Sequence, residues 1–117
     1  MRGGTTVVTV VEQIDERGHH VMLRGRLDVS TVADVRVTMR RIIQDGYLPI
    51  MLDLGEAEVG DATGFGFIVE AARCARRHGR MLTIPEASER TVRLLRRARQ
   101  GHLLDLHPQT VGTLTAL

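Results

Sequence analysis

The spacing of apolar positions along the chain switches repeatedly between a period of two and a period of three to four. The first period is typical of β-strands and the second of amphipathic helices. Strand patterns cover residues 5–14, 20–27, 47–54, 81–84 and 103–106, and helical patterns cover 30–45, 64–78 and 88–100. This order predicts an α/β domain, a single mixed and mostly parallel β-sheet packed with three or four helices.

Turn residues and apolar runs refine the strands. The turn at 15–18 predicts that the first two strands pair as a hairpin. Pro49 stands near the start of the third strand, where proline is tolerated. The continuous Ile-Met-Leu run after it predicts a strand buried on both faces, as in a parallel sheet.

Helix signals define the core faces and the ends. Thr31 and Asp34 resemble a capping box, and Ser88 is expected to cap the third helix. Glycines follow the three helical patterns at Gly46, Gly79 and Gly101. The expected buried faces are Val32, Val35, Met39, Ile42 and Ile43 in the first helix and Phe65, Ile68, Ala72 and Ala75 in the second.

Length and composition favour one small domain with an aliphatic core. The 117 residues suit a single domain over 1–117, with a core at about 5–107 and a tail at 108–117 that is helical or loose. Aromatic residues make up only 3% of the chain. The core must therefore use Val, Leu, Ile, Met and Ala, and a nucleic-acid binder that stacks bases on rings is disfavoured.

The absence of lysine and the presence of a single cysteine exclude several reaction types and an internal disulfide. The chain has no lysine, which rules out a Walker lysine, Schiff-base chemistry and a lysine general base. The lone Cys74 cannot form an internal disulfide, and we interpret it as a small buried hydrophobe in a reducing compartment. Without a membrane-length apolar run or a signal-peptide pattern, we expect a soluble, cytoplasmic protein that does not enter a membrane.

The most informative segment is 59–68, Val-Gly-Asp-Ala-Thr-Gly-Phe-Gly-Phe-Ile, a strand-to-helix turn. Such a turn presents backbone N–H groups at the positive end of a helix. A phosphate-binding loop would need a lysine, and a dinucleotide fingerprint would need Gly or Ala at Val69. A phospho-acceptor role for Asp53 would need an acidic pair after the first strand and a late lysine, so we expect Asp53 to bond local backbone amides instead.

Histidine and arginine patterns bear on ligands and partners. The five histidines lack metal-ligand spacing, so we expect no metal site. No Ser/His/Asp or Cys/His grouping follows a recognisable nucleophile turn, so we also expect no cofactor and no enzyme activity. Their positions are His19, His20, His78, His102 and His107. Arginines cluster at the end of the second helix and along the third, where we interpret them as a solvated face. No helix-turn-helix accompanies them, so an acidic protein is favoured over nucleic acid. The clustered residues are Arg73, Arg76, Arg77, Arg80, Arg90, Arg93, Arg96, Arg97 and Arg99.

Two segments together resemble the STAS domain of bacterial anti-sigma factor antagonists. Residues 23–31, Leu-Arg-Gly-Arg-Leu-Asp-Val-Ser-Thr, are similar to that family's Gly-Glu-Leu-Asp stretch before its first helix. Met-Leu-Asp-Leu at 51–54, followed by Asp-Ala-Thr-Gly-Phe-Gly at 61–66, is similar to its Asp-Ser-Ser-Gly-Leu-Gly turn. The spacing and the order of elements also fit over residues 5–107.

The resemblance implies a protein-binding switch rather than an enzyme. In that family the unmodified domain binds an anti-sigma factor of the serine-kinase type and so regulates transcription. The kinase phosphorylates the first hydroxyl residue after the Asp, and the added charge weakens docking. Here that position is Ala62, which has no oxygen to modify, and Arg26 replaces the family's usual acid. The resemblance places Asp28, Ser30, Asp61, Ala62, Thr63, Gly64 and Phe65 at the partner-binding surface.

Thr63 leaves alternatives open. It is either a structural cap of the second helix or a relocated phosphorylation site. The chain is accordingly an antagonist-like module without the usual switch, a module whose switch has moved to Thr63, or a diverged STAS domain that binds a nucleotide or another regulatory protein. A weak homodimer also remains open.

Overall fold

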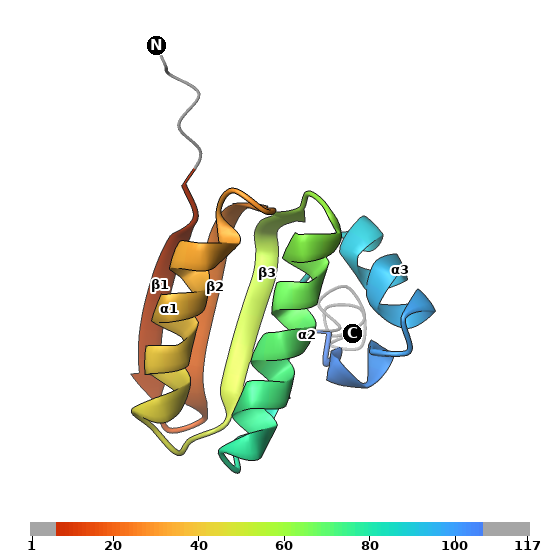
Figure 1. Cartoon of the computed structure of the whole chain (residues 1–117). Helices are drawn as coiled ribbons and strands as arrows, with labels where there is room; N and C mark the ends of the chain where they lie inside the picture. The colour runs from red at the N-terminus through yellow and green to blue at the C-terminus, as the bar shows by residue number, and fades with distance from the viewer. Residues whose placement is uncertain (1–6, 107–117) are drawn as a thin grey trace, which may run out of the picture.

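A computed structural model describes residues 7–106, which form one four-stranded sheet with three α-helices and a short 3-10 helix (Figure 1). The elements are β1 (Thr9–Asp15), β2 (Gly18–Leu27), α1 (Val32–Gln44), β3 (Ile50–Val59), α2 (Ala62–Arg77), β4 (Leu82–Thr83), α3 (Glu89–Arg97) and η2 (Gly101–Leu103). The strand order is β1-β2-β3-β4, with β1 antiparallel to β2 and the other neighbours parallel. The predicted mixed, mostly parallel α/β fold is confirmed, whereas the tail at 108–117 lies outside the described residues.

The hairpin between β1 and β2 forms at the predicted turn. The Asp15 carboxylate accepts hydrogen bonds from the backbone N–H groups of Arg17 and Gly18, at 2.8 and 3.3 Å. Gly18 has φ +147°, which an L side chain rarely adopts. The register then runs from Asp15 opposite Gly18 to Thr9 opposite Arg24.

Both crossover helices lie on the same face of the sheet, α1 over β1 and β2 and α2 over β3 (Figure 1). All five predicted core residues of α1 are buried. In α2, Ile68 and Ala75 are buried as expected, but Phe65 and Ala72 are only half-buried. Phe67 and Ala71 lie deeper instead, because the buried stripe of α2 is turned from the predicted one. Phe67 is the sole buried aromatic residue among residues 7–106, so the predicted aliphatic core is confirmed.

Strand β3 corrects one prediction. It continues to Val59, five residues beyond the expected end, and only one of its faces is buried. Leu52 and Leu54 are buried, whereas Met51 and Asp53 are half-buried on the other side. The helices that connect the parallel strands cover one face only, so the opposite face of the sheet is left open.

Of the two predicted helix N-caps, the one at Thr31 is wrong and the one at Ser88 is confirmed. Thr31 occupies the position before α1 but its side chain makes no capping hydrogen bond, so the expected box with Asp34 is wrong. The Thr31 hydroxyl instead donates to the carbonyl of Arg26 at 2.8 Å and accepts from the N–H of Asp28 at 3.1 Å. Ser88 caps α3 as predicted, accepting from the N–H of Thr91 at 3.2 Å.

Two helix C-termini use residues with positive φ. Gly79 (φ +72°) ends α2 as predicted. Helix α3 ends at Arg97 rather than near residue 100, because Arg99 adopts φ +61° and the N–H of Gln100 returns to the carbonyl of Leu95 at 2.7 Å. The strand predicted at 103–106 is reduced to one bridge between Ile84 and Leu104.

Arg80 is buried, with an exposed fraction of 2%, rather than part of a solvated face. Its guanidinium donates to the carbonyl groups of Ile42 and Ile43 at 2.8 and 3.0 Å and to that of Leu48 at 2.7 Å. It thereby satisfies carbonyl groups at the C-terminus of α1, where no intrahelical donor is available. Burial lowers the pKa of Arg80, which nevertheless stays charged at neutral pH.

Candidate functional site

The two segments singled out in the sequence lie next to each other in the fold. Strands β2 and β3 are parallel neighbours that end in register, with Leu27 opposite Val59. The loop after β2 and the turn after β3 therefore leave the same edge of the sheet (Figure 1). A backbone hydrogen bond of 2.8 Å from the N–H of Gly60 to the carbonyl of Leu27 joins them.

Asp61 ties the turn to the loop and begins α2. One carboxylate oxygen accepts from the N–H of Gly64 at 2.9 Å, which makes Asp61 the N-cap of α2. The other accepts from the N–H of Val29 at 3.0 Å. The structural-cap interpretation of Thr63 is thus wrong: Thr63 lies inside the first turn of α2 and is exposed.

Gly64 sets how closely the helix approaches the loop. A Cβ atom on Gly64 would overlap the carbonyl oxygen of Leu27, so the position requires glycine. Gly64 is itself buried, beneath the exposed residues Ala62 and Thr63. Phe65, half-buried, packs against the core.

The loop before α1 is held by its own polar side chains. The Asp28 carboxylate accepts from both the hydroxyl and the N–H of Ser30, at 2.7 and 2.9 Å. The hydroxyl hydrogen bond of Ser30 contributes most to lowering the pKa of Asp28, with the Ser30 N–H and the nearby Arg26 guanidinium adding to it. Asp28 is therefore ionised at neutral pH, and its charge orders the exposed loop.

Two arginines link neighbouring elements to the turn. Arg26 donates to the carbonyl of Gly60 at 3.2 Å and forms ion pairs with Asp28 at 3.2 Å and Glu58 at 3.4 Å. Arg90 of α3 donates to the carbonyl of Val59. The contacts of Arg26 with Gly60 and of Arg90 with Val59 join residues more than 30 positions apart, so no local pattern in the sequence indicates them.

We define the turn surface as Asp28, Val29, Ser30, Asp61, Ala62 and Thr63. Its centre is apolar and its edge is charged. Val29, which the sequence analysis did not single out, has an exposed fraction of 72%. Ala62 lies on the neighbouring turn, and Asp28 and Arg26 supply charges beside it. A neutral apolar centre with a charged rim is the composition of a protein-docking surface.

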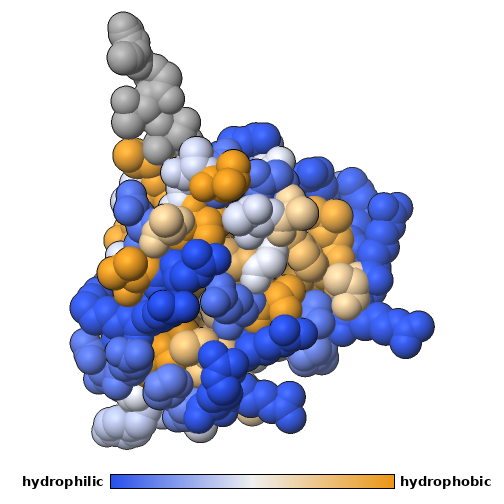
Figure 2. Space-filling model, in the orientation of Figure 1, coloured by the Kyte–Doolittle hydropathy of each residue, from blue (hydrophilic) through white to orange (hydrophobic). Residues whose placement is uncertain are grey.

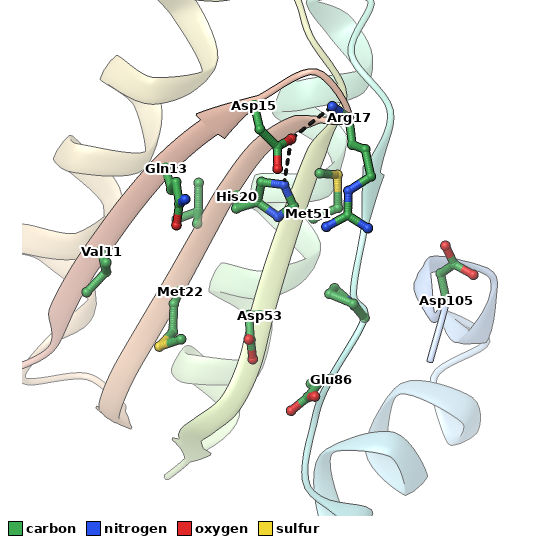
Figure 3. Close-up of a pocket in the computed structure, with 12 residues that line it drawn as sticks. Val11, Gln13, Asp15, Arg17, His20, Met22, Met51, Asp53, Glu86 and Asp105 are labelled. Carbon is green, nitrogen blue, oxygen red and sulfur yellow. Dashed lines mark hydrogen bonds and ion pairs between the residues drawn. The ribbon is translucent and has the colours of Figure 1, made fainter. Parts of the chain in front are cut away.

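The open face of the sheet contains a cavity of about 520 Å³ (Figure 3). In it His20 contacts the Asp15 carboxylate at 3.0 Å. Asp53 accepts from the N–H of Gly55 at 2.8 Å, as the sequence analysis expected of it. Across residues 7–106, no group of three or more His, Cys, Asp or Glu side chains is arranged to hold a metal ion.

Comparison with known proteins identifies the fold family. The family model described as "Mlab, STAS domain" matches residues 10–105, most of the chain. The chain belongs to the STAS domain family. No curated protein matches this STAS domain.

Solved structures with the same fold include anti-sigma factor antagonists. The unphosphorylated form of SpoIIAA has 14% sequence identity and a TM-score of 0.69, over 93% of this STAS domain and 98% of that chain. An anti-sigma factor antagonist from Mycobacterium paratuberculosis has 16% identity and a TM-score of 0.71, over 93% of this STAS domain and 92% of that chain. An antisigma-factor antagonist STAS domain from Rhodobacter sphaeroides has 21% identity and a TM-score of 0.59, over 70% of this STAS domain and 92% of that chain. Between residues 7 and 106, this STAS domain has no helix of the length and apolarity that crossing a bilayer requires.

Proposed function

We propose that this STAS domain is a binding module that docks an anti-sigma factor of the serine-kinase type through the turn surface. The observation that carries the proposal is the pair of hydrogen bonds that the Asp61 carboxylate accepts, one from the loop and one from α2, which unites the two motif segments on one exposed surface. The loop and the turn are held before any partner arrives, which lowers the ordering cost of binding. The fold shared with anti-sigma factor antagonists supports this class of partner.

The proposed module lacks a switch at the usual position. Ala62 is exposed at the start of α2, at the position that corresponds by resemblance to the phosphorylated serine of anti-sigma factor antagonists, and it has no hydroxyl. A phosphate at this position would bring about −1.5 to −2 charges into an interface with an apolar centre. Without that modification, the docking surface stays in its binding state.

Thr63 supports a second candidate function, in which the switch has moved by one residue. Its side chain is exposed and forms no hydrogen bond with the described residues, because Asp61 performs the capping. A kinase could therefore reach the Thr63 hydroxyl without breaking a contact that holds the fold. Phosphate there would again place negative charge beside Val29 and Ala62.

Nucleotide binding at this turn is less well supported. The Asp61 carboxylate already occupies the N–H of Gly64, which a phosphate-binding loop would leave for its ligand. The same carboxylate would repel a phosphate at the helix N-terminus. Calorimetry with ATP and GTP at millimolar concentration should therefore show no heat of binding.

Matched substitutions test the docking surface. Val29→Glu places a charge at its centre, and Val37→Glu places the same charge on α1 at a nearly equal exposed fraction, 72% against 70%. We expect Val29→Glu to weaken binding of a serine-kinase-type anti-sigma factor by more than tenfold, about 1.4 kcal/mol, and Val37→Glu to leave it unchanged. Equal effects of the two variants in calorimetry would refute docking at the turn surface.

A further inference from the structure

A second surface of the molecule concentrates positive charge. Residues 71–104 contain nine arginines and two acidic residues, whereas residues 7–70 contain six arginines and eleven acidic residues. The small net charge of +2 therefore hides two regions of opposite sign. In the fold, residues 71–104 comprise the end of α2, β4, α3 and η2, which lie together along one side (Figure 1).

Within residues 7–106, the arginines of this region take no part in the ion pairs that join other elements. None of the eight ion pairs between described residues includes an arginine from 71–104. Apart from the buried Arg80, all of these arginines are exposed. Residues 1–6 and 107–117 contain no Asp or Glu, so they supply no acidic side chain as a counter-charge.

The helix α3 presents its arginines as one stripe. Thr91 and Leu95 are buried against the domain, and the helical period places the arginines on the opposite side. The stripe consists of Arg90, Arg93, Arg96 and Arg97. Hydrophilic side chains accordingly follow the α3 edge of the molecule in Figure 2.

An apolar groove lies beside this stripe. It has a volume of about 740 Å³ between α2, β4 and η2, and it is named here the C-terminal groove. Its apolar lining includes Val69, Ala72, Leu82 and Leu103, and Arg73 and Arg76 line it as well.

One end of the stripe approaches the groove. The Arg96 side chain packs over Gly101, with its Cγ 3.4 Å from the position that a Cβ atom on Gly101 would take. Gln100 and His102, the neighbours of Gly101, line the groove. Met81 also lines it, with an exposed fraction of 69%.

We propose that the C-terminal groove and the α3 stripe bind an acidic amphipathic helix of a partner protein. The apolar lining would accept the apolar face of that helix, and the arginines would pair with its carboxylates. A small anionic ligand in the groove would leave the distant end of the stripe unused. Nucleic acid would use the arginines but not the apolar lining, and residues 71–104 contain no Phe, Tyr or Trp on which bases could stack. This surface shares no residue with the turn surface, although Arg90 at one end of the stripe donates to the carbonyl of Val59 beside the turn.

A peptide titration of the full-length ¹⁵N-labelled protein tests the proposal. The probe is a synthetic 16-residue helix with Leu on one face and Glu on the other, at low salt. We expect amide shift changes at Ala72, Leu82 and Leu103, and none from a peptide in which every Glu is Gln. Arg76→Glu should weaken binding about fivefold, whereas Arg17→Glu, the same charge change at the exposed hairpin turn, should leave it unchanged.

Circular dichroism of both variants verifies that they are folded before binding is compared. Shift changes confined to the turn surface would overturn the proposal, as would equal losses from Arg76→Glu and Arg17→Glu. Tighter binding of a DNA duplex or of anionic phosphatidylglycerol vesicles than of the Glu peptide, lost in Arg76→Glu, would overturn it in favour of those partners.

Discussion

The carboxylate of Asp61 accepts a 3.0 Å hydrogen bond from the backbone N–H of Val29, across 32 positions of sequence. Together with the backbone hydrogen bond from Gly60 to Leu27, this contact joins the loop before α1 to the turn before α2. Because the other oxygen of Asp61 caps α2, local helix stability and the shape of the turn surface depend on the same side chain.

Asp61→Ala should therefore destabilise the fold and Thr63→Ala should not. The first loses the N-cap and leaves the N–H of Val29 without its acceptor, at a cost of about 1–2 kcal/mol in the free energy of unfolding. The second removes an exposed hydroxyl that caps nothing, with a change within about 0.5 kcal/mol. Urea unfolding of both variants measures the difference, and a larger loss in Thr63→Ala would contradict the assignment of Asp61 as the cap.

Two glycines in the first turns of α2 should respond in opposite directions to alanine. At Gly64 the new Cβ meets the carbonyl of Leu27, so we expect a loss of about 2–3 kcal/mol. At Gly66 no atom lies within 4 Å of the new Cβ, so the helix should gain up to about 1 kcal/mol. Thermal unfolding of the pair gives the comparison. A tolerated Gly64→Ala would show that α2 does not approach the loop this closely.

The end of α3 offers a stabilising change. Arg99 has φ +61°, a conformation that costs an L side chain about 1 kcal/mol and glycine almost nothing. Arg99→Gly should raise the free energy of unfolding by about 0.5 kcal/mol, after the greater freedom of glycine in the unfolded chain is counted. Gly79→Ala, at φ +72°, is the reverse change and should lower it by about 1 kcal/mol. A drop in the melting temperature of Arg99→Gly would contradict the positive φ.

Stability should fall in acid as paired carboxylates take up protons. The pKa of Glu12 is lowered chiefly by a hydrogen bond from Arg41, with His19 contributing. The pKa of Glu12 is lower in the folded state than in the unfolded state. Ionised Glu12 therefore stabilises the fold at pH values above its unfolded-state pKa, and this stabilisation is lost as the pH falls through its folded-state pKa. At pH 7 Glu12→Gln should be less stable than the wild type, and below about pH 5 the difference should shrink. If the two proteins differ in free energy of unfolding by the same amount from pH 7 to pH 3, the ionised Glu12 carboxylate is not the source of the difference.

Elements with a strong period were predictable, and close contacts between distant residues were not. The apolar spacing of α1 identified all five of its buried residues. Arg80 follows an arginine-rich helix and was interpreted as solvated, yet the turn at Gly79 directs the chain so that Arg80 enters the core. Nothing local in the sequence signals the three carbonyl groups that it contacts there.

The candidate site, too, was predictable from the sequence only in part. The motifs pointed to two segments that lie next to each other in the fold. They did not indicate which residue caps α2, because Asp61 and Thr63 both have side chains that can accept a capping hydrogen bond. The extended backbone of Asp61, at φ −162°, decides it. Val29 was missed because a single valine in a loop has no periodicity, although its exposure makes it the apolar centre of the turn surface.

We propose that the turn surface docks a kinase-type anti-sigma factor and lacks a phosphorylation switch at Ala62. The most direct measurement is intact-protein mass spectrometry, with parallel binding calorimetry, after incubation with that factor and ATP. We predict that the wild type gains no phosphate and keeps its affinity, whereas Ala62→Ser gains one phosphate and loses binding. Phosphate on the wild type that Thr63→Ala abolishes would contradict the claim in favour of a relocated switch, and an unmodified Ala62→Ser that binds nothing would contradict the docking itself.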